Sequence, residues 1–251
     1  MTNVFFGFAT GSKTDTGCLR THNEDSLLTL PSAGLWVVAD GMGGHDAGDF
    51  ASQTIVEEVS SIGLPSAAAD QEARFMERLF RANSRILDHS DALGGSTVGA
   101  TVVALLIFEN TFNCIWSGDS RIYLHRNGTL SQQTVDHTEV RELLAAGSIS
   151  EEEARDWPRR NVITRAVGVS PEPQCDEARG HVYNGDLFLL CSDGLYEHME
   201  DDEIAQMLAA HGDPQAACDA LIAETIDRGA RDNVTVVVVR CDELPEPEPE
   251  D

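Results

Sequence analysis

The sequence has 251 residues, 41% of them hydrophobic, so it is long enough to bury a substantial core. Its 43 acidic residues outnumber 17 basic ones, and the net charge of −26 repels nucleic acid phosphates and anionic membrane surfaces. Such acidity either keeps a protein soluble or is neutralised in part by bound cations. Lys13, the only lysine, lies near the N-terminus after Ser12, which excludes a Gly-Lys phosphate loop and the usual strand lysine of a kinase.

The N-terminal segment has no basic region followed by a long apolar run, so no secretory signal is predicted. No stretch approaches the roughly 20 apolar residues of a membrane span. Six cysteines are scattered along the chain without a Cys-x-x-Cys pair or a zinc-binding spacing. These features predict a soluble cytoplasmic protein with reduced thiols, and no membrane or nucleic acid partner.

In the first half of the chain, short apolar runs alternate with longer segments of helical periodicity. The apolar runs predict strands at residues 4–9, 35–39, 97–108, 111–117 and 121–126. Apolar residues at helical spacing predict helices at 47–62 and 70–88. Short turns separate the last three strands, and such connections favour antiparallel hairpins.

The second half opens with a polar, irregular stretch at 136–167. Helices are predicted at 138–146, 150–156, 201–210 and 214–228, and strands at 187–192 and 234–240. Residues 242–251 alternate proline and glutamate and are predicted to be disordered. No linker or repeat interrupts residues 1–241, which predicts a single α+β domain with antiparallel sheets.

Four aspartates occupy similar places relative to the predicted strands. Asp40 and Asp193 each follow a strand, Asp119 lies in a tight connection between two strands, and Asp232 immediately precedes one. Carboxylates gathered at one rim repel one another unless cations lie among them. Oxygen ligands without histidine or cysteine suit Mg²⁺, Mn²⁺ or Ca²⁺ rather than zinc. A lone Asp-Gly pair is usually only a turn, but four such positions together predict a metal cluster.

Seven motifs make the pattern more specific. In chain order they are Arg20-Thr-His-Asn-Glu-Asp25, Val38-Ala-Asp-Gly-Met-Gly-Gly-His45, Gly95-Ser-Thr-Val-Gly-Ala-Thr101, Gly118-Asp-Ser-Arg121, Asp136-His-Thr138, Ser192-Asp-Gly-Leu195 and Asp232-Asn-Val-Thr235. This set resembles the PPM family, the metal-dependent protein phosphatases of the 2C type, in its bacterial form. The resemblance covers about residues 10–240.

The resemblance implies a four-layer α-β-β-α sandwich with two central antiparallel sheets. It also implies two central Mg²⁺ or Mn²⁺ ions and a third, weaker one. In this scheme Asp40 bridges the two central metals, and the backbone carbonyl of Gly41 binds one of them. Asp193 and Asp232 complete the pair, and Asp119 helps to hold the third ion.

The same resemblance gives Arg20 the role of binding the substrate phosphate and Glu24 that of orienting metal-bound water. Residues 136–167 become a mobile flap beside the site. The implied reaction is hydrolysis of phosphoserine and phosphothreonine in proteins by a metal-bridged hydroxide. Two metals about 4 Å apart can bind phosphate oxygens and lower the pKa of a shared water, and a planar guanidinium suits phosphate. The implied partners are phosphorylated proteins and a bacterial serine/threonine kinase that the enzyme opposes, and no oligomer surface is evident, so a monomer is expected.

One position departs from many eukaryotic relatives, in which a histidine that serves as the proposed general acid follows the Asp-Gly pair. This sequence has Met42 there, and a thioether cannot donate a proton, although the bacterial form commonly has methionine. His45 and His137 titrate in a suitable range, but loop histidines with structural hydrogen bonds are the favoured interpretation. The proton donor is therefore unassigned, with a metal-bound water preferred.

Three other functions are weaker interpretations. No cysteine is followed six positions later by arginine, as a thiol phosphatase requires, and Cys191 is expected to be a buried strand residue. A calcium-binding structural domain lacks a dense EF-hand loop here and gives Arg20 no purpose. A catalytically inactive, phosphoprotein-binding regulatory module remains the alternative, although it has no chemical need for all four of Arg20, Asp40, Asp193 and Asp232.

Overall fold

The computed structural model describes residues 5–43, 47–159 and 161–245. Its strands are β1 (Phe5–Asp15), β2 (Asp25–Leu30), β3 (Leu35–Met42), β4 (Gly99–Ala100), β5 (Val102–Phe108), β6 (Thr111–Ser117), β7 (Arg121–Arg126), β8 (Thr129–Gln132), β9 (Asp176–His181), β10 (Asp186–Cys191) and β11 (Val234–Leu244). Its helices are η1 (Pro31–Ala33), α1 (Ala47–Ser60), α2 (Ala68–Ala92), α3 (Glu139–Ala145), α4 (Glu151–Arg155), α5 (Asp193–Tyr196), α6 (Asp201–Ala210) and α7 (Pro214–Asp227).

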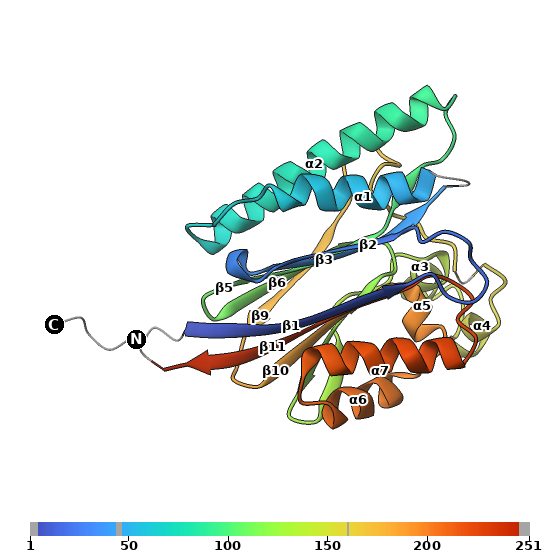
Figure 1. Ribbon diagram of the computed structural model, residues 1–251. Coiled ribbons are helices and arrows are strands. Elements are labelled where there is room, and N and C mark those ends of the chain that lie inside the picture. The colour runs from blue at the N-terminus through green and yellow to red at the C-terminus, as the bar shows by residue number, and fades with distance from the viewer. Residues whose placement is uncertain (1–4, 44–46, 160, 246–251) are drawn as a thin grey trace.

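Two antiparallel sheets lie face to face at the centre of the molecule, with helices on both outer faces (Figure 1). One sheet has the strand order β1-β11-β10-β7-β8, and the other has the order β2-β3-β5-β6-β9 with β4 paired to β3. Helices α1 and α2 cover the second sheet, and α6 and α7 cover the first (Figure 1). This arrangement confirms the predicted α+β fold with four layers.

Apolar side chains fill all three spaces between the four layers. Strand β3 shows how the pleat divides them, because successive side chains point to opposite faces. Trp36 and Val38 lie in the core between the sheets, whereas Leu35 and Val37 pack under α1 and α2. A third core lies between the first sheet and helices α5 to α7. Burial on both faces explains why the central strands are continuous apolar runs.

Local signals set the ends of several helices. Thr138 and Asp213 accept hydrogen bonds from backbone N–H groups as the N-caps of α3 and α7, and Ser150 with Glu153 forms a capping box on α4. Each satisfies a donor that the first helical turn leaves free. Within the described residues, no helix is at once long enough and apolar enough to cross a membrane.

The two terminal strands are longer than predicted. β1 continues to Asp15 and β11 to Leu244, and they pair along their whole length from Phe5–Leu244 to Asp15–Val234. The predicted disorder from residue 242 was therefore wrong for residues 242–244, because their backbone groups find partners on β1. Residues 246–251 lie outside the described residues.

The predicted hairpin between the strands at 111–117 and 121–126 was also wrong. β6 belongs to one sheet and β7 to the other, so the connection between them crosses the sandwich. The chain turns at Gly118, whose φ of 109° suits glycine. A Cβ there would lie 2.6 Å from the side chain of Thr101. The crossing carries Asp119 to the end of the space between the sheets.

Candidate active site

Antiparallel pairing explains why Asp193 and Asp232 meet, although they are far apart in sequence. β10 runs antiparallel to β11 with Cys191 opposite Val236, so the end of β10 lies beside the start of β11. Asp193 opens α5 just after β10, and Asp232 lies just before β11. β7 pairs with β10 on the other side, with Arg121 opposite Cys191. That pairing places the turn of Asp119 next to Asp193.

The second sheet brings Asp40 to the same end of the sandwich. Asp40 lies near the end of β3, and its carbonyl accepts a 2.8 Å hydrogen bond from the backbone N–H of Thr101. The Thr101 hydroxyl lies 2.7 Å from that of Ser120, beside Asp119. Thr101 therefore links the strand of Asp40 to the turn of Asp119.

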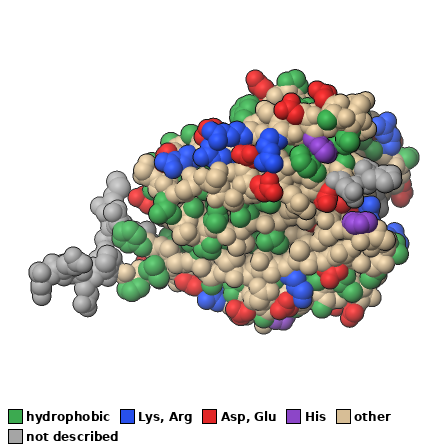
Figure 2. Space-filling model, turned by 45° about the horizontal axis from the view of Figure 1, so that its top comes forward, with side chains coloured by type: hydrophobic (Ala, Val, Ile, Leu, Met, Phe, Trp, Pro, Cys, Tyr) green, Lys and Arg blue, Asp and Glu red, His purple; other side chains and the backbone are tan. Residues whose placement is uncertain are grey.

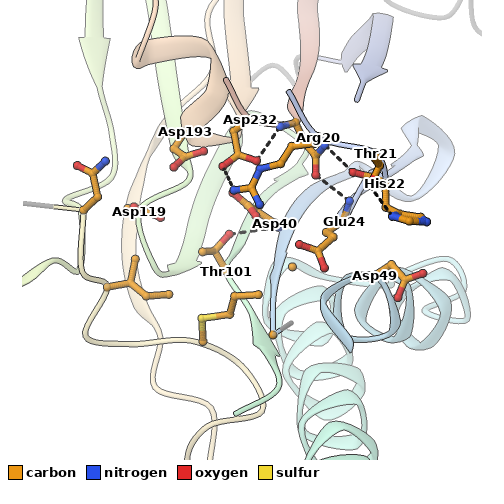
Figure 3. Close-up of a pocket in the computed structure, with 16 residues that line it drawn as sticks. Arg20, Thr21, His22, Glu24, Asp40, Asp49, Thr101, Asp119, Asp193 and Asp232 are labelled. Carbon is orange, nitrogen blue, oxygen red and sulfur yellow. Dashed lines mark hydrogen bonds and ion pairs between the residues drawn. The ribbon is translucent and has the colours of Figure 1, made fainter. Parts of the chain in front are cut away.

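These strand ends enclose a cavity of about 710 Å³. All seven residues that were predicted to act in the site line this cavity, namely Arg20, Glu24, Asp40, Gly41, Asp119, Asp193 and Asp232. Figure 3 shows the side chains of Asp40, Asp193 and Asp232 close to one another, with Arg20 beside Asp232. Met42 and Asp49 also line the cavity.

Two glycines beside the aspartates are required for close packing. A Cβ on Gly41 would lie 2.0 Å from the carbonyl oxygen of Gly48 in α1, and one on Gly194 would lie 2.0 Å from that of Asn233. Real Cβ atoms do not approach so closely, so any side chain would push α1 or the start of β11 away. Glycine after Asp40 and after Asp193 thus lets a neighbouring backbone segment pack closely beside each aspartate. This close packing explains why the sequence has Asp-Gly at both places.

The loop that carries Arg20 and Glu24 is fastened to the site by Asn233. The Asn233 amide donates to the carbonyl oxygens of Thr16 and His22, both at 2.9 Å. Its side-chain oxygen accepts a 2.8 Å bond from the backbone N–H of Glu24. Because Asn233 directly follows Asp232, one short segment supplies a carboxylate and positions the loop opposite.

An ion pair crosses the cavity from this loop. The Arg20 guanidinium lies 2.6 Å from the Asp232 carboxylate, and this hydrogen bond raises the pKa of Arg20. Glu24 lies in the same loop, and its pKa is raised mainly by burial, which Arg20 opposes. The arginine side chain is half exposed, at 51%, so an incoming anion can reach it.

The buried carboxylates are under electrostatic strain. Burial raises the pKa of Asp25 and of Asp119 to about 6. Burial and then the neighbouring carboxylates raise the pKa of Asp40 and Asp193 well above the ordinary range. Removal from water disfavours the charged form, and like charges add to that effect. A cation among these groups would reverse both effects.

The donor set fits divalent cations that prefer oxygen. Asp25 Oδ1 and Asp193 Oδ1 are buried and have no hydrogen-bond partner, and such orphaned acceptors are costly unless something binds them. Within the described residues, no three acidic, histidine or cysteine side chains are grouped tightly enough to form a ready-made metal site. Repulsion between the carboxylates favours wider spacing of these side chains, and Asp232 is paired with Arg20.

Some site residues lay in the quoted motifs but were given no role from sequence. Asp25 is buried opposite Asp40 in the β2–β3 pairing and accepts a 2.8 Å bond from the Ser192 hydroxyl. Thr101 and Asn233 are the linking residues described above. Their presence in the motifs was a signal, but their contacts join distant segments and could not be read from spacing.

The structure also places the candidate histidines. His137 does not line the active-site cavity. Its Nδ1 accepts a 3.2 Å bond from the Gly118 N–H, and its Nε2 lies 3.1 Å from Asp176, so its role is to hold the turn before Asp119. That agrees with the favoured structural interpretation. His45 lies outside the described residues. Cys191 is buried in β10, as expected, and burial raises its thiol pKa to about 12.

A second link joins the predicted flap to the same turn. Arg121 forms two hydrogen bonds to the Asp136 carboxylate, at 3.0 and 2.7 Å. Its guanidinium lies over the Tyr196 ring, 3.5 Å from the centroid, and the Tyr196 hydroxyl donates to the carbonyl oxygen of Asp119 at 3.0 Å. The first residues of the flap are therefore tied to the turn that carries Asp119, and Asn161 and Ile163 near the end of the flap line the cavity.

Comparison with known proteins gives a consistent result. The family model described as Protein phosphatase 2C matches residues 7–143 and 154–234. Serine/threonine phosphatase stp of Listeria monocytogenes serotype 4b (strain F2365) is 34% identical over 238 residues, which cover 92% of this chain and 94% of that protein. Serine/threonine protein phosphatase PstP of Mycobacterium tuberculosis (strain ATCC 25618 / H37Rv) is 37% identical over 235 residues. These residues cover 90% of this chain and 44% of that longer protein.

Solved structures agree. PppA, described as a key regulatory component of T6SS in Pseudomonas aeruginosa, superposes with a TM-score of 0.88 and 41% identity, covering 95% of this chain and 100% of that one. The catalytic domain of PstP in complex with two manganese ions superposes with a TM-score of 0.83 and 33% identity. The match covers 94% of this chain and 99% of that one.

The fold and the carboxylate-lined site define a phosphatase of the metal-dependent class. The chain belongs to the protein phosphatase 2C family. It is a metal-dependent protein serine/threonine phosphatase, as the motifs predicted.

Proposed function

We propose that this chain hydrolyses phosphoserine and phosphothreonine at the cavity described above, with Mg²⁺ or Mn²⁺ held by its aspartates. The observation that carries the proposal is the convergence of Asp40, Asp119, Asp193 and Asp232 with Arg20 in one cavity. The manganese-loaded PstP relative supports two central ions.

The residues divide by position. Asp40 would bridge the two central ions, the Gly41 carbonyl would bind one, and Asp193 and Asp232 would complete the pair. Asp119 lies farther along the crossing between the sheets and would help to hold a third, weaker ion. When bound, the metals supply Lewis-acid chemistry that offsets phosphate charge and lowers the pKa of the attacking water.

Other side chains of this site would act on the substrate and on water. Arg20 would exchange its contact with Asp232 for the substrate phosphate, because a planar guanidinium can donate two parallel bonds to phosphate oxygens. Glu24, whose pKa burial raises, would accept a hydrogen bond from the attacking water and orient it. Met42 lines the cavity but carries no proton, so the leaving group would take its proton from water.

The partners follow from the reaction. The substrates would be phosphorylated proteins, and the enzyme would oppose a serine/threonine kinase in a bacterial signalling circuit. We propose that it acts as a cytoplasmic monomer. The T6SS role of the related PppA suggests that control of a secretion apparatus is one such circuit.

The test is hydrolysis of p-nitrophenyl phosphate and of a phosphothreonine peptide, with Mn²⁺ and with EDTA. Asp193→Asn should lower turnover on the order of 100-fold or more, since even a residue that only supports a metal ligand costs about 10- to 100-fold. Asp219→Asn, a matched change at an exposed ion pair on α7, should leave turnover unchanged. A folded protein that is inactive under every condition would favour the phosphoprotein-binding module instead.

A further inference from the structure

A second cavity, of about 920 Å³, adjoins the active site. The two cavities share Asp119, Asn161 and Asp193. From these residues the second cavity extends between the flap helices α3 and α4 on one side and the segment from α5 to the start of α6 on the other, next to the α7–β11 connection. A polypeptide whose phosphorylated residue occupies the active site therefore has room beside it for the residues that flank the phosphate.

Most positive side chains of this acidic protein are already paired with carboxylates. On the face that carries α1 and α2, arginines lie among acidic side chains (Figure 2), as in Arg81–Glu77 and Arg85–Glu58. The described cations with such an ion pair are Lys13, Arg20, Arg74, Arg78, Arg81, Arg85, Arg121, Arg126, Arg159, Arg165, Arg179, Arg228 and Arg240. Arg155 also has a partner.

Arg141 and Arg231 are the two cations in the described part of the chain that form no ion pair, and both line the second cavity. They come from different elements, Arg141 from α3 and Arg231 from the connection before β11. Both are exposed. In a chain with 43 carboxylates, two unpaired guanidinium groups on one cavity are not expected from chance contacts alone, because exposed arginines readily find acidic neighbours.

The acidic residues of this cavity are mostly engaged elsewhere. Asp136 is held by Arg121, and Glu197 accepts a 2.7 Å bond from Asn161. Asp201 accepts a bond from Tyr123, and Glu200 caps α6. Asp119 and Asp193 lie at the junction with the active site, which leaves Glu151, exposed at the start of α4, as the carboxylate that can compete for the two arginines. The charge of Arg141 and Arg231 is thus available to a ligand.

We propose that this cavity is a subsite for an acidic side chain of the substrate, bound by Arg141 and Arg231, on one side of the phosphorylated residue. The proposal rests on the proposed function, since the phosphorylated residue must occupy the first cavity. An extended chain advances about 3.3 Å per residue, so an aspartate or glutamate two to four residues from the phosphothreonine lies roughly 7 to 13 Å from it, on the scale of adjoining cavities. Guanidinium groups bind carboxylates through charge-assisted hydrogen bonds.

The test compares kcat/KM for phosphothreonine peptides with aspartate or asparagine at positions two to four on either side. Each exposed charge pair should change kcat/KM by about two- to fivefold, so the acidic peptide should be preferred on one side. The preference should disappear in the double variant Arg141→Gln, Arg231→Gln and shrink in 0.5 M NaCl, because salt screens exposed charges. The double variant Arg81→Gln, Arg85→Gln, which removes two positive charges from α2 outside both cavities, is the control and should keep the preference.

p-Nitrophenyl phosphate separates the two proposals, because it has no flanking residues. Its hydrolysis should be the same in the wild type and in all these variants. A wild type without any preference for acidic peptides, or a preference that survives in the double variant, would overturn the subsite and leave the phosphatase reaction intact. Inactivity toward p-nitrophenyl phosphate would count against the proposed function, and anisotropy measurements of peptide binding would then decide the subsite by the same comparison.

Discussion

At the scale of single residues, the site depends on side chains that join segments distant in sequence. Asn233 is 5% exposed and holds the loop of Arg20 and Glu24 with three hydrogen bonds. Thr101 plays the corresponding part between the Asp40 strand and the Asp119 turn. Neither residue has reactive chemistry of its own. Each is needed because carboxylates that repel one another must be held by a rigid backbone.

Asp119→Ala tests the role of the crossing between the sheets. We expect this variant to keep two tight Mn²⁺ sites, since Asp40, Asp193 and Asp232 remain, but to lose most turnover because the weaker third ion is no longer held. Isothermal titration calorimetry counts the tight sites, and p-nitrophenyl phosphate reports turnover. Asp193→Asn is the comparison, and it should lose tight binding as well. Disappearance of both tight sites in Asp119→Ala would show that Asp119 is a ligand of the central pair.

At the scale of elements, the buried strands were predictable from the sequence, whereas β1 alone was predicted among the four edge strands of the described residues. β3, β10 and β11 are continuous apolar runs because both of their faces are covered. The prediction missed β9, whose sequence Asp-Glu-Ala-Arg-Gly-His has almost no apolar content, and β2 and β8, which lie at sheet edges. Such strands are fixed by backbone pairing with a neighbour, and local sequence does not record that pairing.

The candidate site was more predictable than the path of the chain through it. The aspartates could be recognised from the sequence by their positions at strand ends and, except for Asp232, by an adjacent glycine. The sequence did not show that the turn at Gly118 leads from one sheet to the other, because a short turn between two strands usually forms a hairpin. The choice is made by tertiary contacts, among them the bonds of His137 and Arg121 to neighbouring segments.

His137 gives the joint between flap and turn a pH dependence. Burial lowers its pKa, and the neutral ring is needed because Nδ1 accepts from the Gly118 N–H while Nε2 faces Asp176 and Arg165. A lowered folded-state pKa means that the unfolded chain binds more protons. The stabilisation is therefore present above the ordinary pKa of about 6.5 and is lost as the pH falls through the folded-state value.

We therefore expect the free energy of unfolding of the wild type to exceed that of His137→Gln by less at pH 5.5 than at pH 7.5. Urea denaturation of the EDTA-treated proteins measures both values. His181→Gln, a change in an exposed strand residue, should show no such trend. If the difference between wild type and His137→Gln is the same at both pH values, the ring does not act through its neutral form.

At the scale of the whole molecule, two kinds of negative charge must be distinguished. Many of the carboxylates behind the net charge of −26 are exposed at the surface, where salt screens them. In the cluster at the end of the sandwich, Asp25 and Asp119 are buried and Asp40 and Asp193 are half-buried, so screening by salt is weaker there. Unlike the surface charge, this cluster makes folding and metal binding interdependent.

The last prediction follows from the raised pKa values of that cluster. For Asp25 and Asp119 the pKa rises to about 6, so the folded protein binds protons that the unfolded chain releases. The resulting stabilisation is fully present below the ordinary aspartate pKa of about 3.9 and is lost as the pH rises through the folded-state values. The EDTA-treated protein should therefore melt at a lower temperature at pH 7.5 than at pH 5.5. Mn²⁺ should raise the melting temperature more at pH 7.5, because protons compete for the carboxylates at lower pH.

Salt and a variant separate this effect from repulsion over the surface. Differential scanning fluorimetry in 0.5 M NaCl should retain most of the pH trend, since buried charges are screened little. Asp40→Asn removes one central carboxylate, so it should flatten the trend and weaken the response to Mn²⁺, whereas Asp219→Asn, on the exposed side of α7, should change neither. A pH trend that vanishes in salt, or a Mn²⁺ response of equal size at both pH values, would place the strain on the surface instead of in the site.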